Sequence, residues 1–257
     1  MKLILALSEQ ELVESKDELG AIPEGKVLIN TINAHSYNVA QQDEEFAEAL
    51  RTIDNGPVTM KYLIPDGSSI VKACRWLKGK SQPKERIAGW DLFAFEMQRK
   101  NENAEKKNET CRVMFMGSSE KVLRLIRERV AVDYPYLEVV TYSPPYKKVF
   151  SDEDNRNIVK AINEAKPDLL WIGMTAPKQE KWTFRHWEEL QIDCHVGTIG
   201  AVFDFFAGTA QRAPLWWQEH GVEWLYRLIK EPRRMWRRYV IGNPLFLWNI
   251  LKEKYDR

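Results

Sequence analysis

Residues 112–130 read RVMFMGSSEKVLRLIRERV, and this stretch indicates how the chain folds. The mostly apolar run 112–116 has the length of a β-strand, and Gly117 begins a turn. Apolar side chains then recur every three or four positions from Val122 to Val130, which is the spacing of an amphipathic helix. A strand followed directly by such a helix is the repeating unit of sheets with parallel strands.

The same alternation of short apolar runs and helical patterns continues through most of the chain. It predicts strands at residues 26–30, 62–64, 112–116, 138–142, 168–172 and 193–198. The predicted fold class is therefore α/β, with a Rossmann-like, largely parallel sheet and helices on both faces. The polar residues 98–110 (QRKNENAEKKNET) are predicted to form a solvated connection between two βα halves.

The last part of the chain has a different composition. Residues 226–257 hold nine Lys and Arg against three Asp and Glu, although the whole chain has a net charge of only +1. Pro214, Pro232 and Pro244 each stand where a helix can begin. We therefore predict an α/β domain over residues 1–213 and a basic, aromatic helical appendage over residues 214–257.

This appendage points to an anionic partner. Basic helices that also carry Trp and Leu lie well on anionic membrane surfaces, and residues 239–251 are too few to span a bilayer. Two alternatives stay open at this point. Arginine mixed with aromatic residues also binds single-stranded nucleic acid, and a basic helix can simply close the core.

Cysteine usage and the amino-terminal residues indicate the compartment. The three cysteines are far apart and form no CxxC pair, which suits a reducing compartment. The apolar opening 3–7 is too short for a signal peptide, and no run of about 20 apolar residues is present. We expect a cytoplasmic protein, peripheral to the membrane at most.

No pattern in the sequence predicts a metal ion or a cofactor. The four histidines show neither HxH nor HExxH spacing. We expect a metal-independent mechanism with no cofactor, in which Arg or Lys side chains neutralise a leaving phosphate.

Polar residues follow the two amino-terminal predicted strands, and ligands of open α/β sheets bind at the carboxyl ends of strands. Thr31 and Asn33 can hydrogen bond to a sugar or a nucleotide, or Asn33 can cap the next helix. Asp66 can act as a general base at the end of its strand. The alternative is that Asp66 occupies an ordinary turn and caps the following helix.

Two further turns carry candidate ligand groups. Gly117 and the two serines after it can present backbone N–H groups to a diphosphate at a helix amino terminus, although the full GxGxxG spacing is missing. Gln179, in the turn after the strand at 168–172, can hydrogen bond to a uracil or sugar edge. The alternative is a capped helix start in which Glu180 and Lys181 form a solvated pair.

Taken together, these stretches resemble the WecG/TagA/CpsF family of bacterial glycosyltransferases. The resemblance extends over nearly the whole chain, in the family's order. It is carried by residues 31–34 (TINA), 64–67 (IPDG), 85–93 (ERIAGWDLF), 176–182 (APKQEKW), 200–208 (GAVFDFFAG), 211–214 (QRAP), 221–228 (GVEWLYRL), 231–234 (EPRR) and 238–239 (RY).

The resemblance implies a reaction and two substrates. An N-acetylmannosamine-type sugar is transferred from a UDP donor to an undecaprenyl-diphosphate-linked saccharide, with inversion and without a metal. The product belongs to a surface polysaccharide such as teichoic acid, common antigen or capsule. The protein would act at the inner face of the plasma membrane through residues 214–257, with no nucleic-acid partner; a homo-oligomer is left open.

The resemblance also implies roles for individual residues. Asp66 is implied as the catalytic base, with Thr31 as the polar partner beside it. The remaining candidates are substrate-binding residues, and they are Asn33, Arg86, Gly117, Gln179, Glu180, Arg227, Arg233, Arg234, Arg237 and Arg238. A rival interpretation is a non-catalytic, membrane-docked module that binds a nucleotide sugar.

One departure from the family pattern concerns the acceptor. Between Thr31 and Asp66 the chain carries extra residues around 54–59 (DNGPVT). We expect this insertion to lie near the acceptor side of the site.

Overall fold

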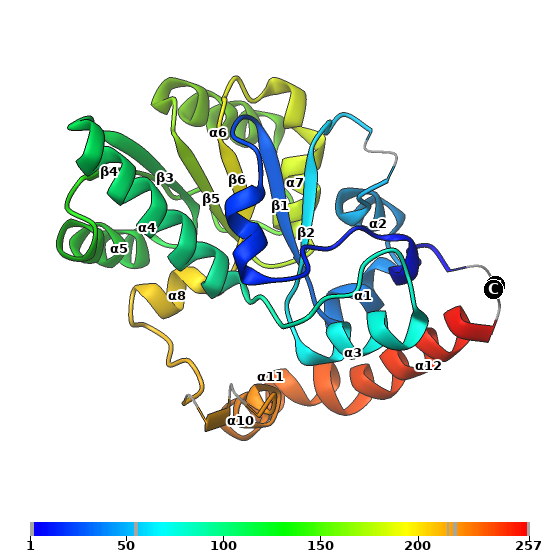
Figure 1. The fold of residues 1–257 in the computed structure, drawn as a ribbon. Coiled ribbons are helices and arrows are strands. Elements are labelled where there is room, and N and C mark those ends of the chain that lie inside the picture. Colours follow the sequence, from blue (N-terminus) through cyan, green and yellow to red (C-terminus); the bar gives the residue numbers. More distant parts are fainter. Residues whose placement is uncertain (1–2, 54–55, 215, 218–219, 256–257) are drawn as a thin grey trace.

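The structure is a computed structural model that describes residues 3–53, 56–214, 216–217 and 220–255, without the side chain of Arg234 (Figure 1). Its centre is a six-stranded sheet in the order β2-β1-β6-β5-β3-β4, and every neighbouring pair of strands is parallel. The strands are β1 (Val27–Ile32), β2 (Lys61–Pro65), β3 (Cys111–Gly117), β4 (Leu137–Tyr142), β5 (Leu169–Gly173) and β6 (His195–Thr198). All six predicted strands are confirmed.

Helices cover both faces of the sheet, as predicted (Figure 1). In chain order they are α1 (Ala34–Ala40), α2 (Glu44–Leu50), α3 (Ser68–Leu77), α4 (Gly89–Lys107), α5 (Glu120–Asp133), α6 (Asp152–Ala165), α7 (Lys178–Arg185) and α8 (Val202–Phe206). The carboxyl-terminal part adds α10 (Glu223–Lys230), α11 (Pro232–Trp236), the π-helix η4 (Arg237–Ile241) and α12 (Gly242–Tyr255). Short 3-10 helices are η1 (Leu7–Glu9), η2 (Lys16–Ala21) and η3 (Trp187–Glu189).

Strand β3 shows why its residues are apolar without interruption. Successive side chains of a strand point to opposite faces of the sheet. Val113 and Phe115 pack in one cluster with residues of α4, α5 and α8, whereas Met114 and Met116 pack in another with residues of α6 and α7. Both faces are buried, so no alternation of polar and apolar residues is needed.

The predicted connection at residues 98–110 was wrong, because α4 continues through most of it. Glu, Lys, Ala and Gln are good helix formers and extend the helix to Lys107. Asn101 and Ala104 are buried beneath the exposed charges, and Asn101 accepts a hydrogen bond from the Tyr136 amide. Asn108, in the left-handed conformation, then ends the helix.

The appendage forms helices, as predicted, along one end of the molecule (Figure 1, orange to red). Helix α11 begins at Pro232, and α12 begins at Gly242, with Pro244 in its first turn. The helix expected from Pro214 falls partly on residues outside the described part of the chain. No helix among the described residues is long and apolar enough to cross a membrane.

Helix α12 is attached to the α/β core through a buried carboxylate. Glu253 accepts hydrogen bonds from the amides of Leu7 and Ser8, at 3.0 and 2.7 Å, and from the Tyr37 hydroxyl at 2.9 Å. Phe246 packs edge-on against the Tyr37 ring in the same cluster. The carboxyl-terminal helix therefore shares a core with the amino-terminal segment, and the domain boundary at residue 213 stays a prediction.

We predict that Glu253→Gln lowers the free energy of unfolding by about 2–3 kcal/mol, because an amide cannot replace a carboxylate that accepts from three donors. Urea denaturation measures the change. Glu188→Gln is the control, since Glu188 is exposed and such substitutions stay within about 0.5 kcal/mol. Equal stability of the two variants would contradict this role of Glu253.

Candidate active site

The site is built where β1 and β2 end, because parallel strands bring their carboxyl ends to one edge of the sheet. The Asp66 amide donates a hydrogen bond of 2.8 Å to the Ile32 carbonyl, which joins the ends of the two strands. The Ile87 amide donates one of 3.1 Å to the Pro65 carbonyl. These two bonds place Asp66 between the end of β1 and the segment that carries Arg86.

Asp66 does not cap a helix. Helix α3 has Gly67 as its N-cap, in a conformation with φ of 139° that favours glycine, and no side chain caps it. The Asp66 carboxyl makes no hydrogen bond with any described residue. Burial raises its pKa, and this effect outweighs the opposing influence of Arg227, Arg86 and Arg238. The result is a carboxyl group that binds a proton more readily than an ordinary aspartate.

The two polar residues of the β1 turn differ in their surroundings. The Asn33 Oδ1 atom accepts hydrogen bonds of 3.1 Å from the amides of His35 and Ser36, so Asn33 caps α1. Thr31 lies in β1 beside Gly89, the first residue of α4, where a Cβ would be 3.7 Å from Thr31 Cγ2. Its hydroxyl group has no hydrogen-bond partner among the described residues.

Helix α10 brings charged side chains to this edge. Glu223 Oε2 accepts a hydrogen bond of 3.0 Å from Arg86 Nη1, and Glu223 Oε1 accepts one of 2.7 Å from Arg227 Nη2. Just before this helix, Gly221 lies so close to Ser68 that an added Cβ would be 3.1 Å from the Ser68 hydroxyl oxygen. The start of α10 is thus in contact with the start of α3, next to Asp66.

The predicted arginines of the appendage do not share one environment. Arg227 and Arg238 are partly buried and act electrostatically on Asp66. Burial, together with Arg238, lowers the pKa of His35 to about 4. Arg233 and Arg237 are exposed instead. The side chain of Arg234 lies outside the described part of the structure.

A second group of candidates lies across the sheet, at the ends of β3 and β5. After β3 the chain continues to β4 on one side, and after β5 it continues to β6 on the other side. Open α/β sheets bind ligands at such a point, where two neighbouring strands connect in opposite directions. Gly117 has φ of 123°, and a Cβ there would lie 2.3 Å from the Gly173 carbonyl oxygen. Only glycine allows this close approach. Ser119 then caps α5 through the Val122 amide.

Gln179 and Glu180 are buried in the first turn of α7. Gln179 accepts a hydrogen bond of 3.1 Å from the Met174 amide and donates one of 2.8 Å to Glu180 Oε1. Glu180 Oε2 has no partner among the described residues, and burial raises the pKa of this carboxyl group to about 7. The alternative of a solvated Glu180–Lys181 pair was wrong, because Lys181 pairs with Asp43 at 2.8 Å.

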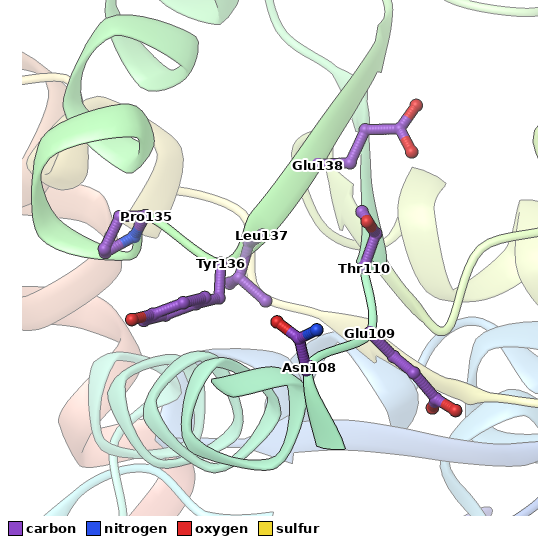
Figure 2. A pocket seen from close by; sticks show the side chains of 7 residues that line it. All are labelled: Asn108, Glu109, Thr110, Pro135, Tyr136, Leu137 and Glu138. Carbon is purple, nitrogen blue, oxygen red and sulfur yellow. The ribbon is translucent and has the colours of Figure 1, made fainter. Parts of the chain in front are cut away.

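The hollow in Figure 2 is not part of this arrangement. Its volume is about 310 Å³, and it is lined by Asn108, Glu109, Thr110, Pro135, Tyr136, Leu137 and Glu138. These residues precede or begin β3 and β4, at the edge of the sheet opposite Asp66. Within the described residues, no three His, Cys, Asp or Glu side chains are grouped so that they could hold a metal ion.

Residues 56–59, the described part of the extra residues around 54–59, also lie at that opposite edge. They lead into the amino end of β2, whereas Asp66 follows its carboxyl end. Gly56 packs against the Phe184 ring, and Val58 is fully buried. These residues are separated from Asp66 by the length of β2. Their position relative to the acceptor stays a prediction, and residues 54 and 55 lie outside the described part of the chain.

Comparison with known proteins decides the family. The model of the glycosyl transferase WecG/TagA/CpsF family matches residues 3–257. The chain belongs to this family. As a WecG/TagA/CpsF glycosyltransferase it has relatives named N-acetylglucosaminyldiphosphoundecaprenol N-acetyl-beta-D-mannosaminyltransferase. That of Bacillus spizizenii is 31% identical over 227 residues, which are 88% of this chain and 79% of the relative. That of Bacillus subtilis is 27% identical over 230 residues, 90% of this chain and 81% of the relative.

The structure adds three residues of this glycosyltransferase to the site that sequence reasoning missed. His35 lies near Arg238, and Arg212 interacts electrostatically with Glu223 and Asp66. Glu223 had a signal in the sequence, because it precedes Arg227 by four residues, the spacing of an ion pair on one helix face. Nothing in the sequence indicated that Glu223 also reaches Arg86.

We predict that Glu180→Gln changes how stability depends on pH. A carboxyl group with its pKa raised to about 7 from 4.5 binds its proton more tightly in the folded protein, so its stabilising contribution is lost as the pH rises through about 7. Glutamine stays neutral, and the variant should therefore lose less stability than the wild type between pH 5 and pH 8. Urea denaturation at several pH values measures this difference, with Glu188→Gln as the exposed control. An unchanged pH dependence in Glu180→Gln would contradict it.

Proposed function

We propose that this glycosyltransferase moves an N-acetylmannosamine-type sugar from a UDP donor to an undecaprenyl-diphosphate-linked saccharide. The product would enter a bacterial surface polysaccharide such as teichoic acid, common antigen or capsule. The observation that carries the proposal is the Asp66 carboxyl at the sheet edge, which has no hydrogen-bond partner among the described residues and on which Arg227, Arg86 and Arg238 act electrostatically. The names of the relatives support the sugar and the acceptor.

In the proposed reaction Asp66 is the general base. Its carboxylate takes the proton of the acceptor hydroxyl as that oxygen attacks the anomeric carbon of the donor sugar. The bond between this carbon and the phosphate oxygen breaks, and UDP leaves with the electron pair. Attack opposite the leaving group inverts the anomeric carbon. Thr31, whose hydroxyl is unpaired among the described residues, is the polar partner that orients a substrate hydroxyl beside Asp66.

Positive charge for the departing UDP comes from arginine side chains. The one DxD spacing in the sequence, Asp152 to Asp154, lies in the first turn of α6, where Asp154 accepts hydrogen bonds from the Ser151 amide and from Lys147. We therefore propose that the mechanism is metal-independent. Guanidinium groups held in place beforehand stabilise the developing negative charge. Arg86 and Arg227 are already positioned by Glu223, and Arg238 lies near Asp66 and His35.

The donor is proposed to extend from Asp66 towards the ends of β3 and β5. Gly117 and the amino terminus of α5 offer backbone N–H groups to phosphate oxygens. Gln179 and Glu180 offer buried polar groups whose hydrogen bonds can select a sugar or base edge. Asn33 uses its Oδ1 atom as a helix cap, which leaves its amide nitrogen for a substrate hydroxyl.

Residues 214–257 are proposed to rest on the inner face of the plasma membrane. Their exposed apolar side chains include Trp224, Ile229, Trp236, Val240, Ile241, Leu247, Trp248 and Leu251. Exposed Arg233 and Arg237 belong to the same helices. Each basic side chain near an anionic leaflet contributes about 1 kcal/mol, so several provide reversible attachment beside a lipid-linked acceptor.

We predict that Asp66→Asn lowers kcat by roughly 10²- to 10⁴-fold, because the amide cannot accept the proton. Affinity for UDP should stay near that of the wild type. Transfer to a short-chain lipid-diphosphate acceptor and calorimetry with UDP measure the two quantities. Asp152→Asn, on the exposed start of α6, is the matched control. Near-normal transfer by Asp66→Asn would remove Asp66 from this role.

We predict that the appendage arginines separate into two functional groups. Arg233→Ala and Arg237→Ala should weaken binding to phosphatidylglycerol vesicles while turnover of a soluble acceptor is retained. Arg227→Ala and Arg238→Ala should lower turnover and leave vesicle binding nearly unchanged. Vesicle binding should also weaken as salt rises, because exposed charges are screened over about 8 Å at physiological ionic strength. Equal effects of all four variants on both measurements would refute the separation.

A further inference from the structure

Glu223 joins two arginines that come from distant parts of the chain. Arg86 lies in the segment between α3 and α4, 137 residues before Glu223, whereas Arg227 lies one turn further along α10. The two carboxylate oxygens are divided between them, with one guanidinium on each. The side chains of all three residues are largely buried, with exposed fractions of 21% for Arg86, 13% for Glu223 and 28% for Arg227.

The two arginines can lie close together only because the Glu223 carboxylate lies between them. Two guanidinium groups repel each other when they are brought together away from bulk water. Glu223 offsets that repulsion and orients both planar groups. Although burial acts to raise the pKa of Glu223, the two arginines lower it, so the carboxylate stays ionised and is a poor general base.

We propose that Glu223 is a positioning residue that holds Arg86 and Arg227 as a pair beside Asp66, so that both guanidinium groups face the diphosphate of a substrate. The inference rests on the proposed function. It explains why Glu223, which is hydrogen bonded to two arginines, lies among the charges of the site.

The hydrogen-bond capacity of the arginines fits this assignment. A guanidinium carries five N–H donors, and Glu223 takes one from each arginine. No other described residue accepts a hydrogen bond from Arg86 or Arg227. Arg227 is held in addition over the Phe205 ring, at 5.2 Å from its centroid. Donors on both groups therefore stay available for phosphate oxygens while the groups themselves are fixed.

Glu223 also adjusts the basicity of Asp66. The charged groups that act on Asp66 are Arg86 from the segment before α4, Arg227 and Glu223 from α10, Arg238 from η4 and Arg212 from the segment after α8. The arginines favour the ionised carboxylate, and Glu223 opposes them. Without Glu223 the arginines would act unopposed and make Asp66 a weaker base.

The test measures binding without turnover, so that an error about Asp66 as the base would leave it intact. UDP and N-acetylglucosamine diphosphate with a short alkyl chain are titrated separately into wild type, Glu223→Gln and the exposed control Glu188→Gln. Glu223→Gln should weaken one of the two ligands by roughly 10- to 100-fold, the effect of losing hydrogen bonds to a charged group. The ligand that is weakened identifies the donor or the acceptor diphosphate as the one that faces the pair.

Two further outcomes decide between positioning and simpler roles. If Glu223→Gln bound both ligands as tightly as the wild type, or more tightly, Glu223 would only occupy the place of a phosphate and the proposal would be overturned.

The double variant Arg86→Glu/Glu223→Arg restores an ion pair between the core and α10, which limited proteolysis at residues 208–222 can verify. Diphosphate affinity and turnover should stay low in it, because no guanidinium remains at position 86. Recovery of both to wild-type values would show that Glu223 only attaches α10, and would also overturn the proposal.

The pH dependence gives a second readout. The acidic limb of the kcat/KM profile of Glu223→Gln should move to lower pH, because the carboxylate that raises the pKa of Asp66 is gone. Glu223→Asp, which keeps the charge, should retain the position of the wild-type limb. A limb that stays in place in Glu223→Gln would contradict the coupling of Glu223 to Asp66.

Discussion

Every strand of the sheet runs in the same direction, and the rest of the structure depends on that constraint. Parallel strands need a crossover after each one, so the helices have to lie on the two faces. The same geometry brings all turns that follow a strand to one edge, whatever their separation in sequence. Thr31, Asp66, Gly117 and Gln179 lie in or just after four different strands, and they are distributed in two groups along that one edge for this reason.

Positive charge exceeds negative charge at this edge, where Arg86, Arg212, Arg227 and Arg238 accompany Asp66 and Glu223. The two carboxyl groups differ in how readily they bind a proton, because their surroundings differ. Glu223 is hydrogen bonded to two guanidinium groups and stays ionised, whereas Asp66 has no hydrogen-bond partner among the described residues and binds protons more readily. Arginine side chains would already be in position to bind the diphosphate of a substrate. The protein would therefore need little rearrangement of charged groups during the reaction.

The candidate site includes side chains from the carboxyl-terminal helices. Glu253 of α12 accepts hydrogen bonds from the amides of Leu7 and Ser8. Gly221, just before α10, packs against Ser68 at the start of α3. One segment thereby supplies Arg227 and Arg238 to the site while it presents exposed Trp and Arg side chains on its outer surface. In the proposed function, this segment would link attachment to a lipid surface with assembly of the active site.

The order of strands and helices could be predicted from the sequence, because apolar periodicity depends on residues close together in the chain. All six strands follow from it, and Asp66 at the end of β2 follows as well. The length of α4 was missed, because a run of polar residues on an exposed helix face has the same sequence pattern as a loop. Packing between distant segments decided three other features. These are whether Asp66 caps α3, which arginines act on Asp66, and where residues 56–59 lie. The pairing of Arg86 with Glu223 across 137 residues is of this kind, because only the docking of α10 and α12 on the sheet edge brings the two side chains within hydrogen-bond distance.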